Sequence, residues 1–419
     1  MKKRLLSGLM ALSLLAGVMG TGGSSSEAAS SVKFKDVPAT HWASEAINAA
    51  VEQGYLKGYT DGTFKPGSPV TKAEMASILG RLRDQPNSAI HQTNTFTDIP
   101  AWAKDGVDLA IQKGFIDPSD YKGKLDAGAS LKRGEMAVWL TQGLATVDAD
   151  YKQALSDVTN TVVPAKEYFT GKLAASEKNA VAVAMGTGLM SVANDKMFGT
   201  DRTTTRAEVA VLIERYSSVA KAKPSDFKGL NELRQVGLTG TNLSIIAPSY
   251  KKTPESKVSP TVDYSMVTDD FSKVRNKEIV TRTNYADLKI RNWIVVSPYA
   301  KEDDRSIYYP VFVDEGTTPN RGSYHSYAEL ELRIKDKMTQ LQAGSLIESP
   351  TINALISPFT QSFAEYSVPK IGDFVNSKGE FNVKESVYWS KGLLHFDKEL
   401  VTQVSLLSKE GALYDVSVN

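Results

Sequence analysis

Three basic residues recur at the same place in a repeated motif, each followed two residues later by a glutamate. A threonine three residues before a glutamate has the form of a capping box, in which the threonine caps a helix and the glutamate reaches back to the cap. This pattern places each cation at the first helical position, where a cation and free backbone N–H groups together can bind a carboxylate or a phosphate. The alternative is a set of solvated first-turn side chains. The motifs are Thr71-Lys72-Ala73-Glu74, Lys132-Arg133-Gly134-Glu135, which lacks the threonine, and Thr205-Arg206-Ala207-Glu208.

Tryptophan and aspartate recur ahead of these motifs. Trp42 and Trp102 each lie five residues before an apolar residue of a predicted helix, Ile47 or Val107. A partly exposed tryptophan next to a cation suits the apolar face of a sugar, and burial in the core is the alternative. Three aspartates precede the same predicted helices, where they can cap the helix or its loop or accept hydrogen bonds from sugar hydroxyls. These are Asp36, Asp98 and Asp157.

The motifs belong to three diverged copies of one helix–loop–helix unit. Each glutamate follows a large apolar residue by 10 positions, and a glycine precedes that apolar residue by 10 or 11 positions. A unit this small cannot bury its apolar stripe alone, so we expect the three copies to share one core. The third copy is longer, and we place an inserted loop at residues 159–172. The sets are Gly54, Phe64 and Glu74; Gly114, Leu125 and Glu135; and Gly188, Phe198 and Glu208.

The composition excludes several classes of function. The chain has 419 residues and a formal net charge of +1, so it lacks the strong positive field that binding to nucleic acid or an anionic membrane requires. It has no cysteine, and therefore no disulfide, thiolate metal site or cysteine nucleophile. Residues 1–29 are predicted to be a secretory signal, since Lys2, Lys3 and Arg4 precede an apolar run that is short for a spanning helix. We expect a secreted protein without a cofactor and without a membrane span after cleavage; an uncleaved membrane anchor is the alternative.

The repeats resemble S-layer homology domains in tandem triplicate, over about residues 31–220. The resemblance rests on Phe34-Lys-Asp36-Val, His41-Trp42-Ala, the run from Gly54 to Phe64, and the Thr-Lys/Arg-Ala-Glu motif. It implies an all-α pseudo-trimer whose grooves between copies bind a secondary cell-wall polysaccharide bearing pyruvate ketals. It also implies that the basic residue pairs with the ketal carboxylate, while the tryptophan and the aspartate line the groove. Carried over, the site residues are Lys72, Arg133 and Arg206; Trp42 and Trp102; and Asp36, Asp98 and Asp157.

The second half of the chain has a different pattern. We place the repeats at residues 30–90, 91–150 and 151–222, and a β-rich α+β domain at residues 223–419. Strands are predicted at residues 290–296, 307–313, 328–334 and 401–407, with a helix over residues 328–341 as an alternative. No HExxH or G-x-S-x-G motif is present there. The acidic pair Asp314-Glu315 fits a solvated turn better than a metal or acid–base site.

The sequence therefore predicts a multidomain, non-enzymatic protein of the cell surface. Its repeats anchor it without a covalent bond to an anionic cell-wall polysaccharide and display the C-terminal domain, whose self-association or binding to other surface proteins would supply further partners. Two alternatives stay open: a wall-anchored hydrolase with its active site in residues 223–419, and a self-assembling S-layer lattice protein.

Overall fold

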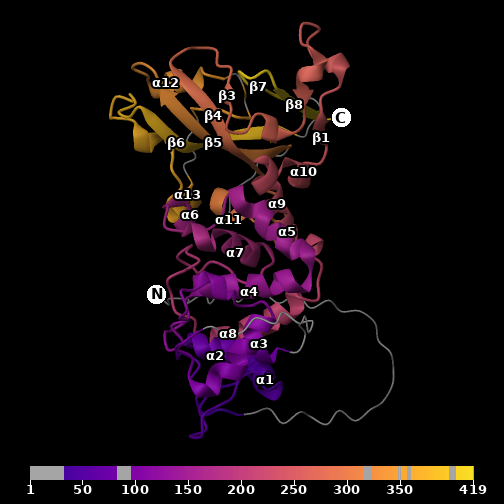
Figure 1. The fold of residues 1–419 in the computed structure, drawn as a ribbon. Helices are drawn as coiled ribbons and strands as arrows, with labels where there is room; N and C mark the ends of the chain where they lie inside the picture. Colours follow the sequence, from indigo (N-terminus) through magenta and orange to yellow (C-terminus); the bar gives the residue numbers. More distant parts are fainter. Residues whose placement is uncertain are drawn as a thin grey trace.

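The computed structural model describes residues 33–82, 96–314, 322–347, 349, 351–355, 360–395 and 403–418, so the predicted signal segment lies outside the described part of the chain. The molecule is elongated (Figure 1). Helices of the repeats occupy one end, β-strands occupy the other, and a column of helices joins them. Among the described residues, no helix combines the length and the apolar character needed to cross a membrane.

Each repeat forms two helices joined by a loop, as predicted. Thr71 and Thr205 each accept a hydrogen bond from the backbone of the glutamate three residues on, so both predicted capping boxes are confirmed. Lys132 provides no side-chain cap. The first unit contains α1 (Ser44–Glu52) and α2 (Lys72–Arg81), the second contains η1 (Ala101–Ala103), α3 (Lys104–Gln112), η2 (Pro118–Asp120) and α4 (Arg133–Val147), and the third contains α7 (Ala175–Gly186) and α8 (Arg206–Val219).

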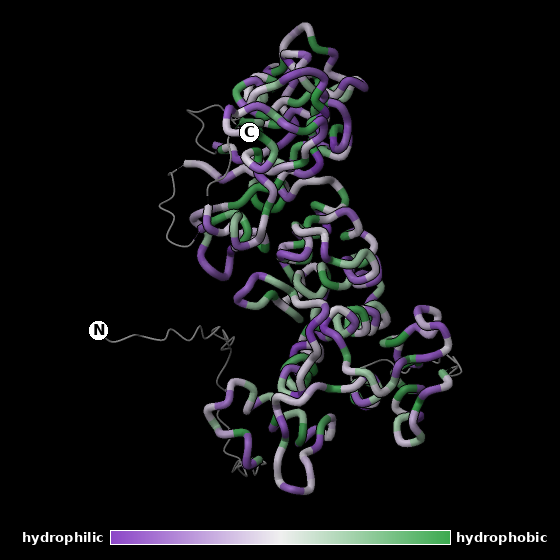
Figure 2. The backbone as a smooth tube through the Cα atoms, turned by 90° about the vertical axis from the view of Figure 1, so that its left-hand side faces the viewer, coloured by the Kyte–Doolittle hydropathy of each residue, from purple (hydrophilic) through white to green (hydrophobic). Residues whose placement is uncertain are grey.

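The three units are joined by a closed ring of backbone hydrogen bonds. Val70 N donates to Thr204 O (3.0 Å), Thr204 N donates to Leu131 O (3.0 Å) and Leu131 N donates to Val70 O (2.8 Å). Each of these residues lies two positions before the second helix of its unit, so each unit is bonded to both of the others at the same place. Apolar residues of all three units fall in one core, as expected. Around this ring, the repeat-containing end of the molecule spreads into lobes (Figure 2).

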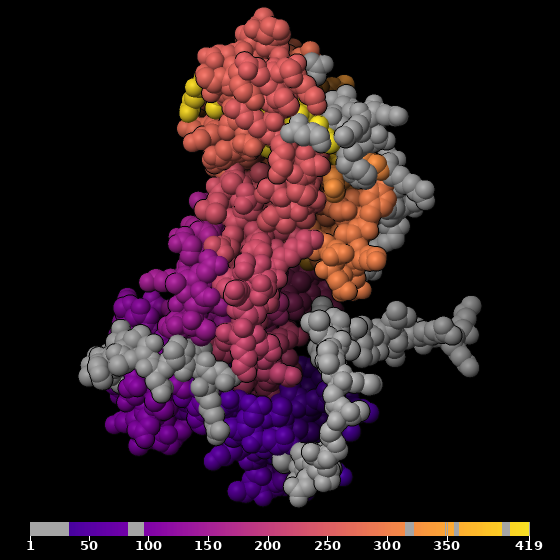
Figure 3. Space-filling view, turned by 90° about the vertical axis from the view of Figure 1, so that its right-hand side faces the viewer, coloured from indigo at the N-terminus to yellow at the C-terminus, as the bar shows by residue number. Residues whose placement is uncertain are grey.

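A column of helices continues from the third unit toward the strands. Leu230, Leu233 and Val236 of α9 belong to the same core as the repeats, because α9 packs against α5 and α7. Gly186 permits this approach, since a Cβ there would lie 2.7 Å from Leu230 Cα. The space-filling view shows an unbroken surface from the third unit to the strands (Figure 3). The elements are α5 (Ala149–Asp157), η3 (Val158–Asn160), α6 (Lys166–Phe169), η4 (Pro224–Asp226), α9 (Lys228–Thr239) and α10 (Leu243–Ile246).

The strands form two sheets around a second core. One sheet is antiparallel throughout in the order β3-β4-β5-β6, and in the other β8 pairs with β1, β2 and β7. The strands are β1 (Tyr250–Lys252), β2 (Val267–Thr268), β3 (Glu278–Ile279), β4 (Ala286–Val296), β5 (Ser323–Ile334), β6 (Glu385–His395), β7 (Gln403–Leu407) and β8 (Leu413–Val418). The remaining short elements are η5 (Glu255–Lys257), η6 (Tyr264–Met266), η7 (Phe271–Lys273), η8 (Glu302–Asp304), α11 (Tyr309–Phe312), α12 (Gln340–Gly344), α13 (Gln361–Tyr366) and η9 (Ile371–Phe374).

Three of the four predicted strands are present. Residues 290–296 fall in β4, and β7 contains the described part of residues 401–407. Residues 328–334 fall in β5, so the alternative helix over residues 328–341 is wrong. The strand predicted at residues 307–313 is also wrong, because these residues form the helix α11. Pro310 lies in the first turn of α11, where its missing N–H costs nothing, whereas a proline would interrupt a strand ladder.

Aromatic side chains join the column to the sheet. Phe312 of α11 stacks on Tyr327 of β5 with ring centroids 4.5 Å apart and contacts Trp389 of β6 at 5.1 Å. Phe169, in the segment predicted as an inserted loop, lies 6.4 Å from both Trp389 and Tyr366. The segment that lengthens the third repeat therefore packs against the C-terminal half instead of projecting into solvent.

A buried acid in α9 makes the stability of the molecule depend on pH. Glu232 is 0% exposed and accepts hydrogen bonds from Asn242 and Ser306, and burial raises the pKa of this carboxyl above its usual value. A raised pKa in the folded state contributes stability that is present below the unfolded pKa and is lost as pH rises through the folded pKa. We expect Glu232→Gln to melt at a higher temperature than the wild type at pH 8, with the difference shrinking near pH 4. Equal melting temperatures at pH 8 would contradict this assignment.

Candidate ligand-binding site

A groove between the three units brings predicted site residues together. It encloses a cavity of about 210 Å³, to which the first unit contributes Trp42, the second unit Arg133, and the third unit Arg202, Glu208 and Arg215. Met190, Ser191, Val192 and Ala193 form one wall. Trp42 is 66% exposed, so the alternative in which it is a core residue is wrong. The groove thus combines an aromatic face with three arginines and a single acid.

Arg133 is buried in the wall of this groove. Its Nε donates to Phe198 O (3.0 Å) and its Nη2 donates to Ser191 O (3.1 Å), both in the loop of the third unit. Its Nη1 lies 3.5 Å from Glu208 Oε1, and its guanidinium lies 5.2 Å from the centre of the Phe198 ring. Burial lowers the pKa of Arg133, and the charge of Glu208 opposes this effect. Arg133 therefore joins the second unit to the third.

Arg206 has the same role at the next junction. Its Nε donates to Phe64 O (2.8 Å) and its Nη2 donates to Lys57 O (2.6 Å), so the third unit is joined to the first. The guanidinium also lies 5.0 Å from the ring centre of Tyr59. Trp102, the second predicted tryptophan, is 64% exposed. The three predicted cations therefore occupy three separate junctions and do not converge on one pocket.

The third junction differs because its cation is a lysine with an internal partner. Lys72 Nζ lies 2.9 Å from Glu135 Oε1 and 5.7 Å from the ring centre of Tyr121. Tyr121 OH donates to Glu135 (2.8 Å) and accepts from Trp139 Nε1 (2.8 Å). The position in the third unit that corresponds to Trp42 and Trp102, five residues before Val181, is Ser176. Lys72 is thus neutralised, and no tryptophan faces it from the equivalent position.

The predicted free N–H groups at the second helices are not free. Lys72 N donates to Ala129 O (2.9 Å), Arg133 N to Arg202 O (2.8 Å) and Arg206 N to Ser68 O (2.9 Å). The next residue of each helix also donates to the neighbouring unit. The expectation that these helix starts bind an anion through backbone donors is wrong, because contacts between the units use them. Any anion must be bound by side chains.

Two of the predicted aspartates cap loops, and the third was assigned wrongly. Asp36 accepts from Phe64 N (2.8 Å) and Lys65 N (2.7 Å), and Asp98 makes the equivalent bonds with Leu125 N and Ala127 N (both 3.0 Å). In the third unit this position belongs to Glu167, which accepts from Phe198 N (3.0 Å) and Gly199 N (2.6 Å). Asp157 instead lies at the end of α5, where Arg234 Nε donates to it at 2.9 Å. The insertion shifted the alignment, and a glutamate among aspartates hid the true equivalent.

The hydrogen bonds to Asp36 and Asp98 also shift their pKa values. Burial acts to raise the pKa of each carboxyl, but the backbone N–H donors outweigh burial and lower the pKa of Asp36 and of Asp98 below the usual value. The stability that these bonds contribute is therefore present above the unfolded pKa and is lost as pH falls through the folded pKa. These two carboxylates support the loops that carry Phe64 and Leu125.

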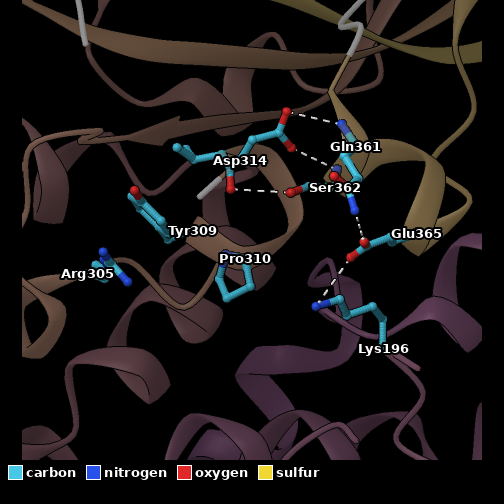
Figure 4. A pocket seen from close by; sticks show the side chains of 9 residues that line it. Lys196, Arg305, Tyr309, Pro310, Asp314, Gln361, Ser362 and Glu365 are labelled. Atoms are coloured by element: carbon cyan, nitrogen blue, oxygen red, sulfur yellow. Dashed lines mark hydrogen bonds and ion pairs between the residues drawn. The ribbon is translucent and has the colours of Figure 1, made fainter. Parts of the chain in front are cut away.

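A second cavity, of about 270 Å³, lies where the third unit meets α11 and α13 (Figure 4). Lys196 Nζ lies 3.3 Å from Glu365 Oε2, and Gln361 Nε2 donates to Glu365 Oε1 (2.7 Å). Asp314 accepts from Gln361 N (3.1 Å) and Ser362 N (2.8 Å), so it caps α13 and is not part of a solvated turn; its predicted partner Glu315 lies outside the described residues. The two acids of this cavity are thus already paired with protein donors, and the cavity carries no net charge.

Acidic and histidine side chains of the described residues form no metal-binding cluster elsewhere. No group of three or more His, Asp or Glu residues suited to a metal ion occurs in the described part of the chain. His325 is buried, which lowers its pKa to about 4, and its Nδ1 lies 3.3 Å from Tyr327 OH. The groove that contains Trp42 is therefore the candidate site.

Comparison with known proteins relates the repeats to proteins of the cell surface. The family model of the S-layer homology domain matches residues 33–76 and 171–210. The S-layer protein sap of Bacillus anthracis is 34% identical over 132 residues, which cover 30% of this chain and 15% of that protein. The cellulosome-anchoring protein of Acetivibrio thermocellus is 30% identical over 139 residues, covering 31% of this chain and 30% of that protein. The S-layer protein EA1 of Bacillus anthracis is 24% identical over 330 residues, covering 73% of this chain and 35% of that protein. The chain thus spans little more than a third of these relatives at most.

Proposed function

This chain is a secreted protein of the cell surface with S-layer homology domains at residues 33–76 and 171–210, and we propose that three such units anchor it to an anionic polysaccharide of the bacterial cell wall. The anchor is a pseudo-threefold assembly, and its grooves bind the polymer without a covalent bond. The C-terminal half is displayed from it. The matching relatives are S-layer and anchoring proteins, which supports a non-enzymatic role.

The family model does not match the second unit, but its backbone supports its being a copy of the same repeat. Gly54, Gly114 and Gly188 end the first helix of each unit in the same left-handed conformation, with φ of 77°, 73° and 71°. A side chain other than hydrogen is strained in this conformation, so the shared glycine reflects a shared turn. The closed hydrogen-bond ring through Val70, Leu131 and Thr204 supports a pseudo-threefold arrangement of the three copies.

The observation that carries the proposal is the juxtaposition of Trp42 and Arg133 across a boundary between units. They are 91 positions apart in the sequence (133 − 42), yet both line the cavity of about 210 Å³. An exposed tryptophan beside guanidinium groups offers an apolar face to a sugar ring and donors to its acidic substituent. We propose an equivalent but distinct groove around Trp102 and Arg206. The Lys72 junction, which is neutralised by Glu135, contributes little binding.

Binding to purified cell walls tests the proposal. The full-length secreted chain is expected to sediment with native walls and not with walls stripped of their non-peptidoglycan polymer. Trp42→Ala is expected to weaken this binding about tenfold, which corresponds to about 1.4 kcal/mol, and Trp102→Ala is expected to weaken it less. Neither change should alter thermal stability, because both side chains are mostly exposed.

Leu341→Ala is the matched control for these variants. Leu341 is 76% exposed and lies in α12, at the strand-containing end of the molecule, so its removal takes away an exposed apolar side chain far from the groove. Wild-type protein that fails to sediment with native walls would overturn the anchoring function. Wild-type sedimentation that is unchanged in Trp42→Ala would leave the anchor standing but overturn its assignment to this groove.

Assembly into a surface lattice is a second candidate function. The alignment with EA1 covers 73% of this chain, and an S-layer protein of Bacillus licheniformis is 27% identical over 247 residues, or 58% of this chain. Both alignments are longer than the repeats, which supports a likeness that extends into the C-terminal half. Ordered sheets of the purified protein in electron micrographs would support assembly, and monodisperse protein at high concentration would argue against it.

A further inference from the structure

The groove beside Trp42 has more positive than negative side chains among its lining residues. Its charged lining residues are Arg133, Arg202, Arg215 and Glu208, so three positive charges face one negative charge. Arg133 is committed to two carbonyl oxygens and to Glu208. The remaining charge of +2 belongs to Arg202 and Arg215.

Arg202 and Arg215 both have exposed side chains. Within the residues that the structure describes, neither guanidinium has a hydrogen bond or an ion pair. Burial is the largest influence on the pKa of Arg133 and lowers it, while the charge of Glu208 raises it. The positive charges of Arg202 and Arg215 lower this pKa further. Both guanidinium groups therefore lie close enough to Arg133 to repel its charge, which is unfavourable unless an anion enters the groove.

The positions equivalent to Arg202 and Arg215 at the other two junctions have no unpaired arginine. Arg202 lies four residues after Phe198, and the equivalent positions after Phe64 and Leu125 are Ser68 and Ala129. Arg215 lies seven residues after Glu208, and its equivalents are Arg81 and Gln142. Arg81 Nη2 donates to Tyr55 O (2.8 Å), and Gln142 Nε2 donates to Asp120 Oδ2 (3.1 Å). Among the described residues at these positions, the groove of Trp42 alone combines an exposed tryptophan with two unpaired arginines.

We infer that Arg202 and Arg215, and not Arg133, bind the acidic groups of the ligand, and that this groove selects a saccharide with two negative charges close together. The inference rests on the proposed function, since it names the ligand class of the same groove. A guanidinium presents paired donors that match the geometry of a carboxylate or a phosphate, and two of them in the groove that Trp42 also lines can hold a doubly charged segment with a sugar ring on the indole. Arg133 is then a positioning residue that supports the wall of the groove.

Binding of a double variant to cell walls tests this inference. The full chain with Arg202→Gln and Arg215→Gln is expected to bind native walls at least about tenfold more weakly than the wild type, and its binding is expected to depend less on salt. The matched control is Lys122→Gln with Lys124→Gln, which removes the same charge from two exposed, unpaired lysines in the loop of the second unit. The control should bind as the wild type does.

Chemically modified walls identify the acidic group. Walls with amidated carboxyl groups and walls with hydrolysed phosphodiesters are compared, and loss of wild-type binding to one of them names a carboxylate or a phosphate as the ligand group. Wild-type binding that survives both treatments would overturn the anionic ligand. Equal losses in the arginine and lysine variants, or no loss in either, would overturn the roles of Arg202 and Arg215 while the anchor remains. Absence of wild-type binding to untreated walls would instead refute the proposed function.

Discussion

Arg133→Ala is expected to unfold the molecule more readily than any other single change in the groove. Arg133 is 7% exposed, and its loss leaves Phe198 O and Ser191 O without their donor and Glu208 without its charge partner. Breaking a buried pair by removing one partner costs about 3–5 kcal/mol. We expect a loss of this size in urea unfolding, together with loss of wall binding, because the loop at residues 190–193 forms a wall of the groove.

Two further variants separate the geometry of Arg133 from its charge. Arg133→Lys keeps the charge but not the fork that reaches two carbonyl oxygens, so most of the stability should still be lost. Arg206→Ala removes the same pair of bonds at a more exposed junction, where water can replace them, and about 1 kcal/mol is expected. If Arg133→Ala keeps the stability of the wild type but loses wall binding, Arg133 contacts the ligand directly. That result would contradict the positioning role.

Glu167→Ala is expected to have the second large effect. Glu167 is 2% exposed and accepts hydrogen bonds from Phe198 N and Gly199 N. Leaving a buried donor unsatisfied costs about 1–3 kcal/mol, so two of them should lower the free energy of unfolding by about 2–6 kcal/mol. Chemical denaturation followed by tryptophan fluorescence measures the loss.

Asp36→Ala is the internal control for this prediction. Asp36 makes the same two bonds in the first unit but is only half-buried, so water can reach the freed N–H groups. A loss of about 1 kcal/mol is expected. Equal losses at both positions would show that burial does not set the cost, and a larger loss for Asp36→Ala would contradict the equivalence of the two loops.

Much of the repeat was readable from the sequence because its signals are local. The capping boxes at Thr71 and Thr205 are hydrogen bonds between residues three apart, and the left-handed turn at Gly54 is a conformation of one residue. The alternation of Ala328, Leu330 and Leu332 likewise reports a strand with one face in the core. Such features depend on chemistry within a single turn or strand, so spacing alone is sufficient to predict them.

Local spacing was thus sufficient to predict the helices of the repeats and two residues of the groove, Trp42 and Arg133, but it did not predict Arg202 or Arg215. Which of the predicted residues are exposed and which are buried depends on the tertiary structure. Arg133 is buried because it donates to carbonyl oxygens of the third unit's loop, and these contacts join residues more than 50 positions apart. The same reason explains why Glu167, and not Asp157, is the third loop cap: the equivalence is defined by a bond to Phe198 N, which spacing cannot reveal across an insertion.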